Sequence, residues 1–157
     1  MVNRNSILII LVSLIFASCD SNRVYEDTAD INNAYWLADS IKSFEFNIPD
    51  ENRGYNISFS IRNGIEFPHS NIYVQYIISD SINNTLDEEL RNFQLFHPKS
   101  GYPFGNGSGN LFEHEFDLLI DYDFPDKGKY NISFQQYMRY DSLPQVFSVG
   151  VRVETPE

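Results

Sequence analysis

The stretch YNISFSIRN, Tyr55–Asn63, contains the pattern that decides the fold. Tyrosine, isoleucine and phenylalanine occupy every second position, and asparagine, serine and arginine occupy the positions between them. Successive side chains of a β-strand point to opposite faces of a sheet, so this alternation predicts a strand with one buried and one solvated face. The segment YNISF recurs at Tyr130–Phe134, where the same alternation predicts a second strand of this kind.

The same period of two continues along most of the chain. Clear alternation is found at Ser43–Ile48, Asn71–Ile78, Leu111–Ile120 and Phe147–Glu154, with weaker candidates at Arg23–Ile31 and Thr85–Phe96. Turn residues separate these segments. This arrangement predicts an all-β fold, an antiparallel β-sandwich of about 7–8 strands with a jelly-roll or immunoglobulin-like topology.

Two of these segments require a more specific prediction. In Leu111–Ile120, we expect one buried face formed by Phe112, His114, Phe116, Leu118 and Ile120. In Thr85–Phe96, the leucines and phenylalanine also fit helical spacing, so a short helix is the alternative. We favour a strand or an irregular crossover there.

The repeated segment is interpreted as scaffold rather than as a duplicated site. Both copies follow a glycine turn, RGY at Arg53–Tyr55 and GKY at Gly128–Tyr130, and both place a tyrosine on the inward face. The second copy resembles the tyrosine corner of β-sandwiches, in which a buried tyrosine hydroxyl bonds to the backbone of the preceding loop.

The N-terminus has the features of a bacterial lipoprotein signal. Arg4 precedes the apolar run Ile7–Phe16, and the small residues Ala17 and Ser18 precede Cys19, the only cysteine of the chain. The run is shorter than the ~20 apolar residues of a membrane-spanning helix. We expect residues 1–18 to be removed and Cys19 to carry acyl chains that anchor the protein to a membrane. An ordinary signal peptide with a leftover thiol is the alternative.

Length and charge limit the remaining possibilities. After the signal, we expect an acylated tether and first strand region at 19–30 and a single β-sandwich domain at 31–157. The formal net charge is −11, which disfavours binding to nucleic acid because phosphate contacts need lysine and arginine.

No constellation of catalytic residues is recognisable. His69, His97 and His114 have no partner at metal-ligand spacing, and we expect His114 to be a structural histidine on a strand and the other two to lie in exposed loops. The acids of DYDFPDKG do not match a calcium loop, although an edge site using Asp121, Asp123 or Asp126 is a minor alternative. We therefore predict a non-enzymatic protein without cofactor or metal.

Three aromatic residues are candidate contacts for a partner or a glycan. Tyr102 and Phe104 belong to the glycine-rich segment His97–Phe112, which is typical of a recognition loop but could instead cover one mouth of the sandwich. Trp36 could stack on a sugar or fill the core, and we favour the core.

The order of features resembles the GldH family of gliding-motility lipoproteins of Bacteroidetes. The matching segments are Cys19–Ile31, Asp39–Phe46, Tyr55–Asn63, Phe67–Tyr76 and Gly128–Glu154, together with Trp36. The resemblance implies an envelope lipoprotein that serves gliding motility and is associated with the type IX secretion machinery, and we expect it to act as a scaffold for other envelope proteins. No acidic run of the kind linked to surface display follows Cys19, which favours the periplasmic side. A carbohydrate-binding lipoprotein that uses the exposed aromatics is the alternative.

If the protein comes from Bacteroidetes, as this resemblance implies, four short triplets are candidate O-glycosylation motifs. DTA, two copies of DSI, and DSL match the Asp-Ser/Thr-aliphatic pattern that Bacteroidetes glycosylate on exported proteins. The candidate O-glycosylation sites are Thr28, Ser40, Ser81 and Ser142. Aspartate and serine are also common in turns, which accounts for some of the matches.

Overall fold

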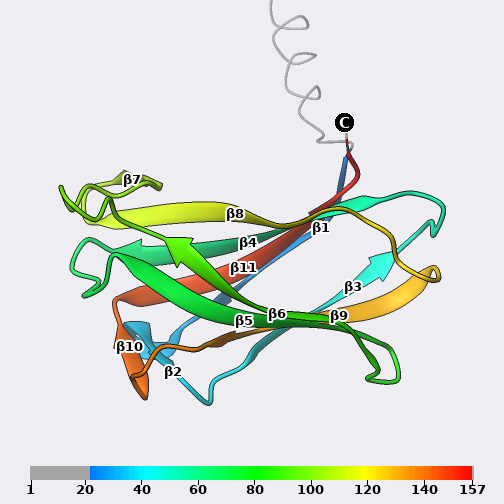
Figure 1. Ribbon diagram of the computed structural model, residues 1–157, viewed down its shortest axis with the longest axis horizontal. Coiled ribbons are helices and arrows are strands. Elements are labelled where there is room, and N and C mark those ends of the chain that lie inside the picture. The colour runs from blue at the N-terminus through cyan, green and yellow to red at the C-terminus, as the bar shows by residue number, and fades with distance from the viewer. Residues whose placement is uncertain (1–21, 157) are drawn as a thin grey trace, which may run out of the picture.

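Two antiparallel sheets face one another across a single core in the computed structural model, which describes residues 22–156 (Figure 1). The strands of the five-stranded sheet, in spatial order, are β1 (Arg23–Asp30), β11 (Val146–Glu154), β4 (Tyr55–Gly64), β8 (Leu111–Tyr122) and β7 (Asn106–Ser108). Those of the four-stranded sheet are β3 (Lys42–Ile48), β9 (Gly128–Gln136), β5 (Asn71–Asp80) and β6 (Thr85–Gln94). The predicted β-sandwich is confirmed, and the segment at Thr85 is a strand.

A small third sheet closes one end of the sandwich. It pairs β2 (Tyr35–Leu37) with β10 (Ser142–Pro144), and a short 3₁₀ turn, η2 (Asn32–Ala34), leads into β2. The alternation pattern did not predict these short strands, because three residues are too few to establish a period.

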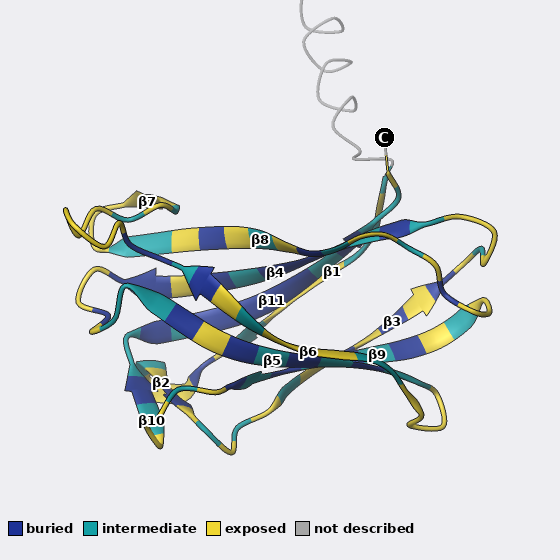
Figure 2. Ribbon diagram, viewed as in Figure 1, coloured by how far each residue is buried: buried dark blue, intermediate teal, exposed yellow. Residues whose placement is uncertain are grey.

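The core lies between the sheets, where the strands carry their buried residues (Figure 2). Many of these buried residues are aromatic. The two YNISF copies belong to opposing sheets, β4 and β9, and their inward residues meet. The ring centroids of Phe59 and Phe134, the last residue of each copy, are 4.8 Å apart. Alternation therefore places one face of each copy in the core, as the sequence predicts.

Both repeated tyrosines act as corners. The Tyr130 hydroxyl donates to the carbonyl oxygen of Asp126 at 2.6 Å, which confirms the predicted tyrosine corner. The Tyr55 hydroxyl likewise donates to the carbonyl oxygen of Asp50 at 2.7 Å. The Phe124 ring packs between the two, with centroids 5.8 Å from Tyr55 and 4.5 Å from Tyr130. The repeat is thus one structural solution used twice.

The predicted buried face of Leu111–Ile120 is wrong at its last position. His114 and Leu118 are buried, but Ile120 is 70% exposed. Its neighbour Leu119 pairs with Ile57 instead, because β8 uses an extra residue relative to β4 on either side of that pair. Such bulges move the following side chains to the other face of the sheet.

The first strand, β1, lies within residues 19–30, the region predicted to hold the tether and the first strand. β1 pairs with β11 from Arg23↔Glu154 to Asp30↔Ser148, so it is an edge strand of the five-stranded sheet. We therefore place the start of the domain at Arg23. The predicted signal peptide, residues 1–18, lies outside the described residues.

Candidate interaction site

The two ends of the described chain meet at one end of the sandwich. The Thr155 amide donates to the carbonyl oxygen of Asn22 at 2.8 Å, and Figure 1 shows both ends next to the turns that follow β3 and β8. We call this the near end. Cys19, the predicted lipidation site, lies outside the described residues, three positions before Asn22. The opposite end, where β4, β6 and β9 finish, is the far end.

Trp36 is not available as a contact residue. Its side chain is fully buried, and its indole N–H donates to the carbonyl oxygen of Ser40 at 2.8 Å. It lies opposite Leu143 in the small sheet, and Leu143 is also fully buried. The structure thus supports the prediction that Trp36 fills the core, and neither face of its indole ring is exposed to stack on a sugar.

Tyr102 and Phe104 are exposed at the far end. Their side chains are 75% and 58% exposed, so they do not cover the mouth of the sandwich. Backbone hydrogen bonds hold the segment in place: His97 N–H donates to the Tyr102 oxygen at 2.7 Å, and Phe104 N–H donates to the Leu95 oxygen at 2.9 Å. This arrangement presents two aromatic rings on a braced loop.

A second aromatic cluster, which the sequence analysis did not identify, forms a groove near the far end. We call it the tyrosine groove. It has a volume of about 510 Å³ and is lined by His69, Tyr73, Leu90, Tyr137, Met138, Arg139 and Tyr140. The available signal was weak: Tyr73 is on the polar face of its strand, and YMRY at Tyr137–Tyr140 follows the second YNISF copy.

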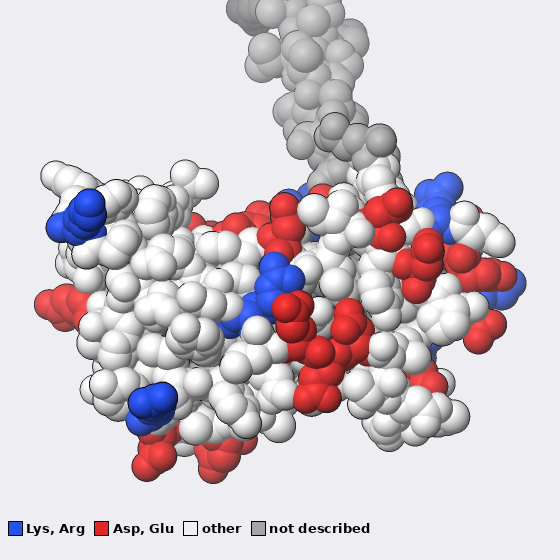
Figure 3. Space-filling model, in the orientation of Figure 1, with Lys and Arg blue, Asp and Glu red and all other residues white. Residues whose placement is uncertain are grey.

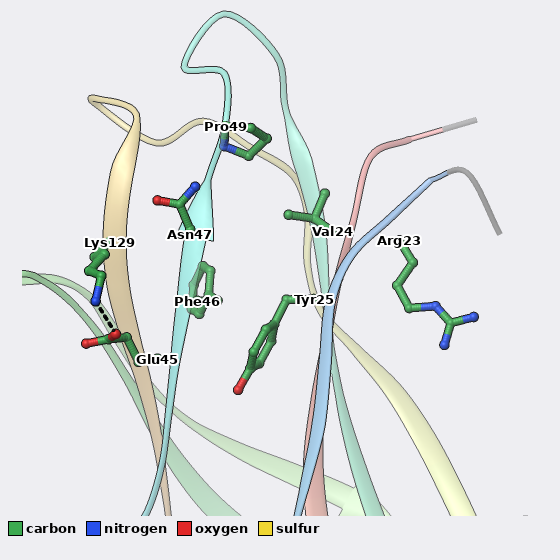
Figure 4. Close-up of a pocket in the computed structure, with 8 residues that line it drawn as sticks. All are labelled: Arg23, Val24, Tyr25, Glu45, Phe46, Asn47, Pro49 and Lys129. Carbon is green, nitrogen blue, oxygen red and sulfur yellow. Dashed lines mark hydrogen bonds and ion pairs between the residues drawn. The ribbon is translucent and has the colours of Figure 1, made fainter. Parts of the chain in front are cut away.

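Another hollow, between edge strands β1 and β3, has a structural explanation (Figure 4). The Tyr25 ring lies 6.0 Å from the Phe46 ring and covers the open side of the core. Burial, followed by the nearby Asp27 carboxylate, raises the pKa of Tyr25. Lys129 and Glu45 form a surface ion pair at 2.7 Å. The Tyr25–Phe46 contact thus links the edge strands of the two sheets, and the ion pair joins β3 to β9 within the four-stranded sheet.

The three histidines do not converge on a site. His114 is buried beside Phe116, and burial lowers its pKa to about 4. His69 packs against Tyr140 with ring centroids 5.0 Å apart, whereas His97 is exposed. Within residues 22–156, no three histidine, cysteine or acidic side chains are grouped to hold a metal ion.

The four candidate glycosylation residues differ in accessibility. Thr28, on β1, and Ser81, in the turn after β5, are exposed. Ser40, which follows β2, and Ser142, the first residue of β10, are partly buried. Thr28 and Ser81 are therefore the more accessible acceptors.

The surface charge is predominantly negative. Figure 3 shows more carboxylate than cationic side chains on the viewed face. On β6, Arg91 pairs with Glu89 at 3.2 Å and donates to the Leu118 carbonyl oxygen of β8 at 3.2 Å, which links the two sheets on this side. Among the described residues there is also no helix long and apolar enough to cross a membrane.

These features define a β-sandwich domain with exposed aromatic residues near its far end. A family model described as GldH lipoprotein matches residues 23–153, so the chain belongs to the GldH lipoprotein family. It is 27% identical to the gliding motility lipoprotein GldH of Flavobacterium johnsoniae, with 96% of each chain covered. It is 28% identical to a GldH homolog of Christiangramia forsetii, over 94% of this chain and 93% of that one.

Solved structures share only the fold. A GH115 4-O-methyl-α-glucuronidase aligns with 89% of this chain at a TM-score of 0.50 and 8% identity, and the match spans 18% of that enzyme. The VP2 subviral particle of infectious bursal disease virus aligns with 87% of this chain at a TM-score of 0.47 and 14% identity, over 33% of the viral chain. At these identities the likeness concerns the sandwich alone.

Proposed function

We propose that this protein is a lipid-anchored component of the cell envelope that serves the gliding machinery, and the type IX secretion associated with it, as a non-enzymatic scaffold. Family membership supports the motility role, since its relatives are named for gliding motility. In this role the protein faces the periplasm and acts by binding other envelope proteins.

The observation that carries the proposal is the position of the exposed aromatic residues. Tyr102 and Phe104 lie in the segment between β6 and β8, toward the far end, and are 75% and 58% exposed. Aromatic residues are enriched in the energetically dominant positions of protein interfaces. The exposed pair Tyr102 and Phe104, held on a braced loop, therefore suits recognition of a partner protein.

Lipidation of Cys19 would orient this surface. Two residues, Asp20 and Ser21, separate Cys19 from Asn22, and a fully extended chain spans at most about 10 Å over these three steps. The anchor would therefore hold the near end close to the membrane, and the far end would point away from it. Acyl chains on a single cysteine, each methylene worth ~0.8 kcal/mol, give durable attachment.

In-cell photo-crosslinking tests the proposal. A photoreactive residue in place of Phe104 should capture an envelope protein in the native host, and Tyr102→Ala should reduce the yield. The matched control replaces Ile82, which is 75% exposed in the turn between β5 and β6 at the near end. Capture from position 82 but not from 104 would contradict a far-end docking surface. Cys19→Ala should move the protein from the membrane fraction to the soluble fraction.

A further inference from the structure

The outer face of the four-stranded sheet has an unusual composition for this protein. Register places Gln75 between Gln135 and Leu90 on neighbouring strands, and Tyr73 lies beside Asn92 in the next row. The uncharged polar side chains on this face are Ser43, Asn47, Asn71, Gln75, Ser79, Asn92, Asn131, Ser133 and Gln135. The tyrosine groove lies at the far end of the same face.

The charges of this face nearly cancel. Glu45 pairs with Lys129, and the Glu88 carboxylate accepts a hydrogen bond from the Gln75 amide. Arg139, in the groove, forms no ion pair with any carboxylate of residues 22–156. A face without net charge is notable on a chain whose formal net charge is −11.

The outer face of the five-stranded sheet is different. Its register carries the charged residues Glu26, Asp30, Arg62, Glu113, Glu115, Asp117 and Arg152. Arg152 pairs with Glu26 at 3.0 Å and with Glu115 at 3.4 Å. This face therefore carries five acidic and two basic residues, whereas the outer face of the four-stranded sheet carries Glu45, Lys129 and Glu88 among amides, hydroxyls and tyrosine rings.

The tyrosines of the groove are held in place from below. The side-chain amide of buried Gln136 accepts from Met138 N–H at 2.8 Å and donates to the Tyr140 carbonyl oxygen at 2.9 Å. Tyr137 N–H donates to the Tyr73 carbonyl oxygen at 2.8 Å. The Tyr140 ring also contacts His69. The segment Tyr137–Tyr140 is therefore braced although its tyrosine rings are exposed, which limits the entropy lost on binding.

We propose that this face binds an uncharged polysaccharide chain, with one or more sugar rings stacked on Tyr73, Tyr137 and Tyr140. The carbon-bound hydrogens of a pyranose form apolar faces that pack on aromatic rings, and its hydroxyls match the paired donors and acceptors of asparagine and glutamine. Gln75 and Gln135 lie next to the tyrosines. Their side-chain nitrogens donate to the Glu88 carboxylate and to the Ala38 carbonyl oxygen, so their side-chain oxygens accept from the hydroxyls of the following sugar units. Arg139 donates to sugar oxygens at the end of the groove.

The composition favours a glycan over a protein at this face. The centre of a protein interface is apolar, whereas here the row next to the tyrosines consists mainly of side-chain amides. An acidic glycan is disfavoured because only Arg139 offers an unpaired cation in the groove and the protein as a whole is strongly negative.

Titration of the full-length protein in detergent with defined hexasaccharides tests the proposal. The neutral probes are cellohexaose, laminarihexaose, xylohexaose and mannohexaose, and hexagalacturonate is the charged comparator. At least one neutral probe should bind at millimolar or lower concentration by calorimetry, and hexagalacturonate should bind more weakly. Tyr73→Ala and Tyr137→Ala should each raise the dissociation constant about tenfold or more.

An exposed tyrosine outside the groove is the matched control. Tyr35→Ala removes a tyrosine that is 54% exposed and should leave the affinity unchanged. Equal melting temperatures of all variants would exclude unfolding as the cause. The proposal is overturned if no neutral probe binds, if binding persists in the Tyr73→Ala/Tyr137→Ala double variant, or if a photoreactive residue at position 137 captures a protein while no glycan binds. Crosslinking from position 104 tests protein docking separately.

Discussion

His114 should make the stability of the protein fall as the pH is lowered from neutral toward 4. Its side chain is 3% exposed, its ring lies between those of Phe96 and Phe116, and its Nε2 atom has no hydrogen-bond partner. Burial lowers the pKa of His114 to about 4. In the unfolded chain the pKa of a histidine is ~6.5, so the unfolded state binds the proton first as the pH falls.

The size of the effect follows from this difference in pKa. Each pKa unit corresponds to ~1.4 kcal/mol, so the full loss, reached below about pH 4, is roughly 3 kcal/mol. At pH 5.0 the expected loss from this one residue is about 2 kcal/mol, and at pH 7.5 it is about zero. The loss therefore develops between about pH 6.5 and pH 4.

Urea unfolding of the wild-type protein and of His114→Leu at pH 7.5 and pH 5.0 measures this contribution. Leucine cannot be protonated, so the free energy of unfolding of His114→Leu, relative to wild type, should rise by about 2 kcal/mol between the two pH values. Titration of carboxylates such as Asp50 and Asp80, whose pKa values are lowered by hydrogen bonds, is common to both proteins and cancels. His97→Leu, at an exposed histidine, is the control. The same pH dependence in wild type and His114→Leu would refute the reasoning.

Three further predictions concern the scaffold and its modification. Tyr130→Phe and Tyr55→Phe each remove a hydroxyl that donates to a loop carbonyl, and each should cost about 1–2 kcal/mol in urea unfolding; no loss in either would contradict the corner assignment. Phe124→Ala should cost about 3–5 kcal/mol because the ring packs against both corner tyrosines, whereas Phe104→Ala, at an exposed ring, should change stability by less than ~0.5 kcal/mol. Intact-mass spectrometry of protein from the native host should show glycan mass that decreases in Thr28→Ala or Ser81→Ala, and a mass equal to the acylated polypeptide would exclude O-glycosylation.

The sequence predicts which residues of a strand face the core, because alternation of apolar and polar residues can be observed within a single segment. Tyr55 and Tyr130 begin alternating runs, and their inward side chains follow directly from strand geometry. Ile120 breaks this rule, because the bulges in β8 arise from its pairing with β4, which is not encoded in the alternation of Leu111–Ile120 itself. Trp36 was ambiguous for a related reason: a three-residue strand has no period, and its burial depends on Leu143 more than a hundred positions away.

The tyrosine groove could not be predicted from one segment. Tyr73, Leu90 and Tyr137 come from three parts of the chain and meet only because β5 lies between β6 and β9. Each residue alone looks like an ordinary exposed aromatic or aliphatic side chain, which needs no functional explanation. Only the sheet order shows that these residues share a face with the amides of Gln75 and Gln135.

The two tyrosine corners also explain how the ends of the sandwich can have different roles. Both corner hydroxyls bond to loops at the near end, through Asp50 and Asp126, and the Phe124 ring packs between them. Substitutions there should lower stability, because they remove core contacts and hydrogen bonds together. The far end presents Tyr102, Phe104 and the tyrosine groove without burying their rings, so substitutions there should change binding while leaving the fold intact. Stability and binding measurements on the same set of variants therefore separate the scaffold from the interaction surface.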